Sequence, residues 1–473
     1  MGEQLSMLDT MFLELEQADE SAHMHIGAAL VFEALPGGGA PEIGALREHV
    51  AARMGLLPRF AQQLSGTHAG LLSWLTWEPA PAVDIEAHVR HATLPAPGDD
   101  AVLREWLADF WSHRLDRHRP LWEMVLLEGL EDGRWALATK THHCLVDGVG
   151  SLDIGHLLLD ATPDPAPRDP VPLAGNGDAD ARGGGRFWVT PGLLVRGARA
   201  GLGAARHPRE TLERTRAAVE LVIREEVIPA PTCSLNAPLG GTRRFAAVHA
   251  DLEDVKAIKT RLGGTVNDVV LAACAGGLRH LLLSRGEPVP DRDLRAQVPV
   301  NIRAHDKQHA LGNELTSLFV ELPVGEPDPL RRYRRVVERA QQLKHGSQRA
   351  GGKTIIDLAD MGPPLAGAVI ARSMFGTSRM FNLTITNVPG PQQRLFCFGA
   401  PMVDVLPLVP LFAGHAVGIA VVSYAGRMIF GINADRLATP DVDVLADGLR
   451  RALAELRGPT LVEPPVAAVG AHS

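Results

Sequence analysis

The spacing of apolar positions switches between two periods in the first third of the chain. Residues 135–141 alternate with the period of a strand, and this run leads directly into a pair of histidines. Residues 41–54 instead repeat apolar positions at helical spacing. Two short apolar runs, at 25–32 and 121–127, are strand-like. These patterns predict a mixed α/β layer structure.

The second half of the chain, which opens near Phe245, again mixes the two types of element. Helical spacing recurs at residues 268–283 and 330–343, and strand-like runs recur at 315–322 and 428–432. The sequence contains no short-period repeat. We therefore expect a second mixed α/β unit rather than an array of repeats.

A stretch that is poor in apolar side chains separates these two units. Residues 162–185 are dense in proline, glycine and aspartate and cannot bury enough apolar area to fold, so they predict a linker. Residues 186–224 are basic, and they predict either an interfacial segment on anionic lipid or a helical connector packed on both domains. The expected division is a first domain at 1–161, linker and connector at 162–235, a second domain at 236–458 and a loosely held tail at 459–473.

Length and charge narrow the classes of protein that fit the chain. At 473 residues it exceeds the usual size of one hydrophobic core, so two domains with a shared interface are expected. A net charge of -8 gives no general reason to bind nucleic acid, whose recognition relies on Lys and Arg side chains that neutralise phosphates. The start of the chain is amphipathic and acidic without a secretory pattern, and no apolar run is long enough to span a membrane.

The cysteines favour a reducing compartment. All four lie far apart in the sequence, which matches neither zinc-ligand spacing nor a compact disulfide framework. We therefore expect a cytoplasmic protein, peripheral at the inner membrane or at lipid inclusions if residues 186–224 are interfacial. The cysteines are Cys144, Cys233, Cys274 and Cys397.

The segment HHCLVDG, which begins at His142, carries the sharpest chemical signal in the sequence. An imidazole at a strand end beside a turn is accessible from a cleft, and its pKa near neutrality suits it to take up and return a proton. Asp147 is close enough to fix the turn, and Gly148 permits a backbone angle that other residues avoid. From these residues alone, the histidine pair fits a satisfied core position, half of a metal site or a general base equally well.

Further motifs accompany this segment in a fixed order along nearly the whole chain. They are LD at 8–9, FL at 12–13, MH at 24–25, PLW at 120–122, NDVVLA at 267–272 and NVPGP at 387–391, with HHxxxDG unaltered at 142–148. With this ordered set, the sequence resembles the wax ester synthase/diacylglycerol acyltransferase family. That family lies within the CoA-dependent acyltransferases that share HHxxxDG, such as chloramphenicol acetyltransferase and the condensation domains of nonribosomal peptide synthesis.

The resemblance implies a fold and a mechanism. The fold is α/β (α+β), with two chloramphenicol-acetyltransferase-like domains, each a mixed sheet flanked by helices, and an active-site tunnel between them. His143 is implied as the general base, which accepts the proton of a hydroxyl as that oxygen attacks the thioester carbonyl and then returns it to the CoA thiolate. No acyl-enzyme is required, so acyl-CoA and the acceptor meet in one ternary complex.

No cofactor is expected beyond acyl-CoA as co-substrate, and no metal. His23 and His25 share one face of a strand-like run and could be mistaken for metal ligands. Spacing in the sequence indicates no third ligand, and the reaction needs no metal.

The neighbours of His143 have supporting roles in this interpretation. His142 is expected to be structural rather than catalytic, and Asp147 to hold the loop by a salt bridge, with Arg303 as a candidate partner. Cys144 beside the base raises the alternative of a Cys–His nucleophile. Strand alternation disfavours that alternative, because it would turn the thiol away from His143.

Four other positions are candidates for contact with the substrates. Asn267 and Asp268 follow Thr265 at a helix start, where Asp268 either caps the helix or lies in the site. Asn267 and the helix N-terminus are candidates for donors near the tetrahedral oxyanion or for contact with the acceptor. Trp122 either shapes the tunnel or belongs to the core, and Gly148 is expected to border the substrate.

The resemblance implies transfer of a long-chain acyl group from acyl-CoA to the hydroxyl of diacylglycerol, which yields triacylglycerol. It also implies transfer to long-chain alcohols, which yields wax esters. The first alternative is a relative that takes its acyl chain from a carrier protein or acylates a polyketide or glycolipid hydroxyl. The second is a non-catalytic lipid-binding relative, against which the intact His143, Asp147 and Gly148 argue.

Overall fold

A computed structural model describes residues 3–5, 7–65, 75–145, 155, 158–165, 229–301, 315–349 and 380–458. Several sequence predictions lie outside these residues. They are the linker beyond residue 165, the connector at 186–224, the tail at 459–473, and the site candidates Asp147, Gly148 and Arg303.

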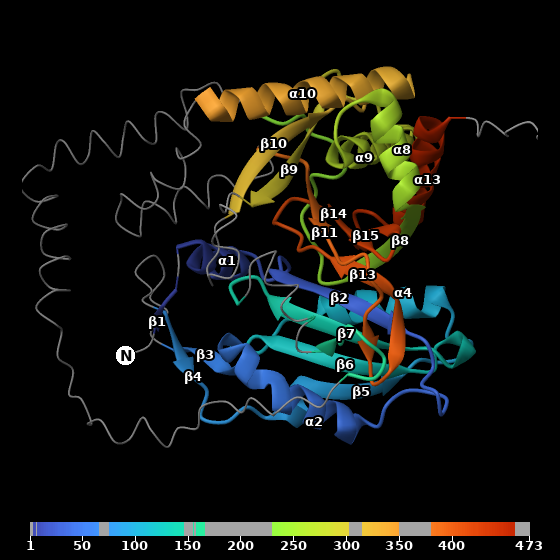
Figure 1. Ribbon diagram of the computed structural model, residues 1–473. Coiled ribbons are helices and arrows are strands. Elements are labelled where there is room, and N and C mark those ends of the chain that lie inside the picture. Colours follow the sequence, from blue (N-terminus) through green and yellow to red (C-terminus); the bar gives the residue numbers. More distant parts are fainter. Residues whose placement is uncertain are drawn as a thin grey trace, which may run out of the picture.

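Six strands form the first sheet, in the order β12-β13-β2-β7-β6-β5. Neighbouring strands are antiparallel except β5 and β6, which are parallel. A small sheet in the order β1-β4-β3 lies beside it (Figure 1). The strands are β1 (Glu3–Gln4), β2 (His25–Phe32), β3 (Gln62–Ser65), β4 (Thr76–Pro79), β5 (Val89–Thr93), β6 (Trp122–Glu128), β7 (Trp135–His142), β12 (Phe396–Cys397) and β13 (Ala400–Leu408). The helices of this half are α1 (Met7–Ala18), α2 (Ile43–Arg53), α3 (Ile85–His88) and α4 (Asp100–Ser112), with short 3-10 turns η1 (Met54–Leu56), η2 (Pro58–Ala61) and η4 (Glu131–Gly133).

The second sheet also has six strands, in the order β10-β9-β11-β14-β15-β8. β11 is parallel to both of its neighbours, and the other pairs are antiparallel. Its strands are β8 (Arg243–Asp251), β9 (Leu294–Asn301), β10 (Leu315–Leu322), β11 (Leu383–Pro389), β14 (Val417–Tyr424) and β15 (Arg427–Asp435). Its helices are α8 (Leu252–Leu262), α9 (Val266–Ser284), α10 (Pro329–Arg349) and α13 (Val442–Arg457).

The predicted elements coincide with observed ones wherever the structure describes them. The runs at 25–32 and 315–322 are β2 and β10 with the same bounds. This agreement has a physical cause, because the buried face of each element imposes its own period on the sequence. The other matches are 41–54 with α2, 121–127 with β6, 135–141 with β7, 268–283 with α9, 330–343 with α10 and 428–432 with β15.

One strand from the second half of the sequence belongs to the first sheet. β13 pairs with β2, with Val405 opposite Leu30, and β12 extends the edge beyond it. Residues 396–408 lie inside the predicted second domain at 236–458, but their strands belong to the sheet of the first domain. β13 also passes close to β15, since a Cβ on Gly431 would lie 2.0 Å from the carbonyl oxygen of Pro407. Only glycine fits at this contact between the sheets. Figure 1 shows β13 at the boundary between the two halves.

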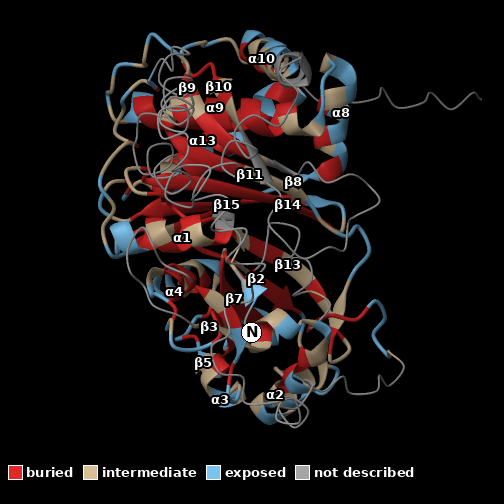
Figure 2. Cartoon of the chain, turned by 90° about the vertical axis from the view of Figure 1, so that its left-hand side faces the viewer, coloured by how far each residue is buried: buried red, intermediate tan, exposed pale blue. Residues whose placement is uncertain are grey.

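Helix α9 is the centre of the second hydrophobic core. By length and composition it is the one helix, in the part of the chain that the structure describes, apolar enough to cross a membrane, which differs from the expectation that no run is long enough. Its most apolar window is 72% buried inside the protein, against the second sheet and α13 (Figure 2). We interpret α9 as a core helix, because its apolar side chains are already covered by protein.

Candidate active site

The two histidines of the HHxxxDG motif lie where β7 ends. His142 is the last residue of the strand and stands opposite His25 of β2. His143 begins a turn that is closed by a hydrogen bond from the Leu145 N–H to the His142 carbonyl, 2.9 Å. The His143 N–H donates to the Met24 carbonyl at 2.8 Å, which ties the turn to the residue just before β2. Two neighbouring strands therefore fix the backbone that carries His143.

The ring of His143 packs against helix α1. It stacks on Phe12, with ring centroids 4.1 Å apart and an interplanar angle of 23°. Phe12 belongs to an apolar cluster that also contains Phe381 and Phe412 from the second half of the chain. Figure 1 shows α1 lying between the two sheets, so His143 is close to the junction of the two halves.

The surroundings of His143 keep its imidazole neutral, and they lower its pKa below the value near neutrality that the sequence predicts. Burial lowers the pKa of His143 to about 4, and the neighbouring His142 adds to this effect. The imidazole is therefore neutral at neutral pH, which is the state that can accept a proton. The residue as a whole is half-buried.

The ring of His142 points into the protein instead. Its Nδ1 accepts a hydrogen bond from the backbone N–H of Cys144 at 3.1 Å. Because Nδ1 is the acceptor, the ring proton is assigned to Nε2. That Nε2 lies 3.5 Å from Oε2 of Glu16, and the side chain of His142 is 1% exposed. The ring of His142 is therefore buried against Glu16, and its structural role stays a prediction.

Sequence reasoning missed Glu16. This residue of α1 is 2% exposed, and its Oε2 accepts from Nη2 of Arg117 at 2.6 Å. Burial raises the pKa of the Glu16 carboxyl, but the rings of His142 and His25 outweigh burial and hold the pKa below its usual range. The signal was present in the sequence, because Glu16 follows Phe12 by four residues and so lies on the apolar face of an amphipathic helix.

Cys144 is not placed to act as a nucleophile. Its side chain is 4% exposed, and its Sγ lies 2.9 Å from Nδ1 of His142. Burial raises the pKa of the Cys144 thiol well above its usual value, so the reactive thiolate does not form near neutral pH. The sequence argument against a nucleophilic Cys144 relied on strand alternation. That argument does not apply, because β7 ends at His142, before Cys144.

The two motifs in the second half of the chain meet through their asparagines. The Asn387 side-chain amide donates to Oδ1 of Asn267 at 3.4 Å, which joins the start of α9 to β11. Asp268 caps α9, since its Oδ2 accepts from the N–H and hydroxyl of Thr265 at 2.7 and 2.8 Å. The capping alternative for Asp268 is thus observed, and contact of either residue with substrate stays a prediction. The NVPGP motif by itself does not predict the contact of Asn387 with Asn267.

Trp122 lies in the first hydrophobic core. Its ring stacks on His88 at 4.4 Å, its Nε1 donates to the Phe60 carbonyl at 2.9 Å, and it is 3% exposed. The structure therefore favours the core alternative over a tunnel wall for this residue.

The rings of His23 and His25 stack, with their centroids 5.5 Å apart. Among the described residues, no group of three or more His, Cys, Asp or Glu side chains could hold a metal.

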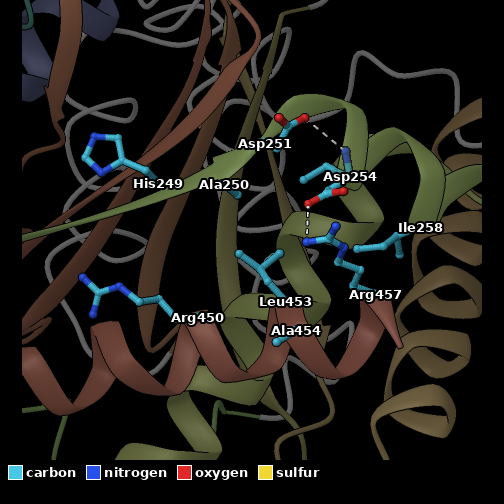
Figure 3. Close-up of a pocket in the computed structure, with 10 residues that line it drawn as sticks. His249, Ala250, Asp251, Asp254, Ile258, Arg450, Leu453, Ala454 and Arg457 are labelled. Atoms are coloured by element: carbon cyan, nitrogen blue, oxygen red, sulfur yellow. Dashed lines mark hydrogen bonds and ion pairs between the residues drawn. The ribbon is translucent and has the colours of Figure 1, made fainter. Parts of the chain in front are cut away.

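A surface hollow lies elsewhere, between β8, α8 and α13 (Figure 3). Its volume is about 250 Å³, and none of the predicted site residues lines it. Its arginines are already paired, Arg457 with Asp254 at 2.9 Å and Arg450 with Asp447 at 2.6 Å. Both arginines that line the hollow are therefore neutralised by neighbouring carboxylates.

Two mixed sheets, the first of which includes strands β12 and β13 from the second half of the chain, and a histidine turn at their junction define a fold shared with condensation domains. A condensation domain of the calcium-dependent antibiotic synthetase has the same fold at a TM-score of 0.59 and 18% identity, covering 97% of both chains. The chain itself belongs to the wax ester synthase/diacylglycerol acyltransferase family. The catalytic-domain model of that family matches residues 5–270, and its C-terminal model matches 311–457.

Individual relatives agree with this assignment and confirm the predicted α/β fold. The chain is similar to the wax ester synthase/diacylglycerol acyltransferase of Marinobacter aquaeolei VT8, with a TM-score of 0.72 and 27% identity over 96% of this chain and 98% of that one. It is also similar to a Mycobacterium tuberculosis protein named "Probable diacyglycerol O-acyltransferase tgs1". Those two sequences are 33% identical over 96% of this chain and 95% of the relative.

Proposed function

We propose that the protein transfers a long-chain acyl group from acyl-CoA to the hydroxyl of diacylglycerol, with long-chain alcohols as further acceptors. Family membership over nearly the whole chain supports this reaction class. The observation that carries the proposal is the position of His143, a half-buried residue with a neutral imidazole in a turn at the junction of the two sheets. A neutral imidazole that is fixed by two strands is what proton transfer to and from the reacting oxygen needs.

The reaction proceeds in one ternary complex. Nε2 or Nδ1 of His143 takes the proton of the acceptor hydroxyl while its oxygen attacks the thioester carbonyl carbon. The carbon–sulfur bond of the tetrahedral intermediate then breaks, and the imidazolium returns the proton to the CoA sulfur. The products are an ester and free CoA, and no enzyme group is acylated. The unreactive thiol of Cys144 supports a direct transfer of this kind.

The surroundings of His143 suit apolar substrates. The cluster around Phe12 supplies methionine, leucine and phenylalanine side chains from both halves of the chain. Apolar walls exclude water from the reacting carbonyl and so disfavour hydrolysis of the thioester. We propose Asn267 as a donor to the oxyanion, since its Oδ1 accepts from Asn387 and its side-chain amide N–H groups are the donors that an oxyanion requires.

The lipid acceptor requires contact with a lipid phase, and we propose a cytoplasmic protein that binds peripherally at the inner membrane or at lipid inclusions. The basic composition of residues 186–224 supports this proposal. Blue-shifted fluorescence of Trp188 on addition of anionic vesicles is the expected result. An unshifted spectrum would favour the connector alternative for this segment.

The deciding experiment gives the purified protein a long-chain acyl-CoA with diacylglycerol and a fatty alcohol in competition. Lipid products are analysed by mass spectrometry while release of the CoA thiol is followed. We expect triacylglycerol to dominate with one thiol released per ester formed. Dominant wax ester would keep the mechanism and change the acceptor. Absence of thiol release with both acceptors would contradict the proposal and favour a carrier-bound donor or a non-catalytic relative.

A further inference from the structure

Helix α1 contacts both histidines of the HHxxxDG turn. Phe12 stacks on His143, and Glu16, one helical turn further along, lies 3.5 Å from Nε2 of His142. Residues four apart share one face of a helix, so a single rigid element supports both rings. Figure 2 agrees with Figure 1 in placing α1 at the level between the two sheets.

The burial of Glu16 has an energetic cost that requires compensation. A buried carboxylate is strongly destabilising unless charged or hydrogen-bonded partners surround it. Arg117 supplies the opposite charge, with Nη2 at 2.6 Å and Nε at 3.2 Å from Oε2, and Arg114 lies at 3.5 Å from the same oxygen. The two arginines neutralise Glu16 from the solvent side.

The inner side of the carboxylate faces two histidines. Oε1 lies 3.4 Å from Nε2 of His25, and Oε2 lies 3.5 Å from Nε2 of His142. These separations are long for hydrogen bonds, so the attraction is mainly electrostatic, between the carboxylate and ring N–H groups in a buried setting. Because Nδ1 of His142 accepts from the Cys144 N–H, Nε2 is the nitrogen that carries a proton toward Glu16.

We propose that Glu16 is a positioning residue for the proposed acyl transfer. Its carboxylate holds the Nε2–H of His142, which keeps Nδ1 bare and bonded to the Cys144 backbone, and this fixes the turn that presents His143. The inference rests on the proposed function only for its kinetic readout. A carboxylate without an assigned role in any of the sequence motifs thereby becomes part of the site.

The test compares Glu16→Met with Glu16→Gln. Met has a similar volume but accepts no hydrogen bond, whereas Gln keeps one side-chain oxygen that can accept from His142. We expect kcat to fall about 10- to 100-fold for Glu16→Met, as for a base misplaced by about 1 Å, with KM for both substrates within about two-fold of wild type. Glu16→Gln should recover part of the lost kcat. A residue that only fills space would show the opposite order, since Met packs better than Gln in an apolar setting.

A double-mutant cycle with His142→Asn tests whether Glu16 acts through His142. Asn keeps an oxygen that can accept the N–H two residues later, but it has no group that reaches Glu16. If Glu16 works through His142, Glu16→Met adds little to the loss already caused by His142→Asn. Losses in kcat that multiply would overturn the proposal.

Exposed Glu20, two residues beyond α1, provides the matched control. Glu20→Met should keep wild-type kcat and melting temperature. A folded Glu16→Met variant with wild-type kcat would overturn the inference, and so would a variant in which KM rises while kcat is unchanged. If Glu16→Met does not fold, the cycle is run with Glu16→Gln. Losses in kcat from Glu16→Gln and His142→Asn that multiply would likewise overturn the proposal.

A second readout does not depend on turnover. Diethyl pyrocarbonate acylates accessible neutral imidazoles, and peptide mass spectrometry reports the rate at His143. We expect Glu16→Met to change this rate several-fold relative to Glu20→Met because the turn loosens. An unchanged rate would overturn the positioning role, whereas absence of acyl transfer by the wild-type protein would contradict only the proposed function.

Discussion

The end of β7 and the start of α9 carry the two most distinctive motifs of the chain, and they are stabilised in different ways. At α9, Thr265 and Asp268 satisfy each other across three residues in a capping box. At β7, the turn at His143 is held by Met24 and Phe12, which are more than a hundred positions away in the sequence. The first region is built by local hydrogen bonds and the second by tertiary packing.

Because of this difference, we expect the capping box to affect mainly the stability of the protein and the turn at His143 to affect mainly its activity. A capping box contributes to the helix that it begins and needs no partner outside that helix. The turn at His143 instead depends on buried titratable groups of α1 and β2, which destabilise a core unless they are paired. Substitutions at the end of β7 should therefore change activity strongly, and substitutions in the capping box of α9, at Thr265, should change mainly the free energy of unfolding.

The largest expected effect is at His143. His143→Ala removes the proposed base, and we expect kcat to fall about 100- to 10,000-fold. The melting temperature should stay within a few degrees of wild type, because the His143 backbone hydrogen bond to Met24 does not depend on the side chain. Thiol release under saturating acyl-CoA and diacylglycerol measures the loss. A wild-type rate in a folded variant would remove the base assignment.

Acid should affect the β7 region through its neutral histidines. Burial lowers the pKa of His23 to about 4, whereas an unfolded chain protonates histidine below about pH 6.5. Between these values the unfolded state binds more protons, so the free energy of unfolding falls as the pH falls. His23→Gln should flatten this dependence by up to about 1.4 kcal/mol per pH unit. Denaturant unfolding at pH 5 and pH 7 measures the slope, and equal slopes in both proteins would contradict the prediction.

The acid limb of activity should report His143 itself. Its pKa of about 4 means that kcat/KM should stay level as the pH falls from 8 to about 5. Below pH 4 the imidazole is protonated and kcat/KM should fall about ten-fold per pH unit. Initial rates within seconds of a pH jump separate this loss from unfolding. An acid limb near pH 6.5 would mean that His143 is as solvated as a free histidine.

Trp122 tests whether a motif residue near β7 is chemical or structural. Trp122→Phe removes the Nε1 hydrogen bond to the Phe60 carbonyl and leaves that buried acceptor unsatisfied. We expect a loss of about 1–3 kcal/mol in the free energy of unfolding, with kcat and both KM values unchanged. A KM raised several-fold for either substrate would instead place Trp122 in the tunnel.

The smallest effect is expected at the start of α9. Thr265→Ala removes the side-chain oxygen that accepts from the Asp268 N–H, and it should cost about 1 kcal/mol of stability. Turnover should not change, because the capping box does not involve Asn267. A fall in kcat of more than a few-fold would mean that the helix start is coupled to the reaction and that the two regions are less separate than their contacts indicate.

Much of the fold could be read from the sequence because its signals are local. The period of apolar side chains predicts β2 and β10 with the observed bounds, and the Thr265-x-x-Asp268 spacing predicts the capped start of α9. The position of β13 could not be read in this way. Its pairing with β2 joins residues about 370 positions apart, and strand pairing over such a distance leaves no local pattern.

The same distinction applies to the site. The motif HHxxxDG at 142–148 and the family resemblance identify the candidate base and the reaction class without any tertiary contact. Only the tertiary structure decided that His143 meets Phe12, that Trp122 belongs to the core, and that Glu16 faces His142. A residue type and its spacing specify which chemistry is available. Which groups are buried together, and therefore what their charge states are, depends on contacts between distant segments that form only when the chain folds.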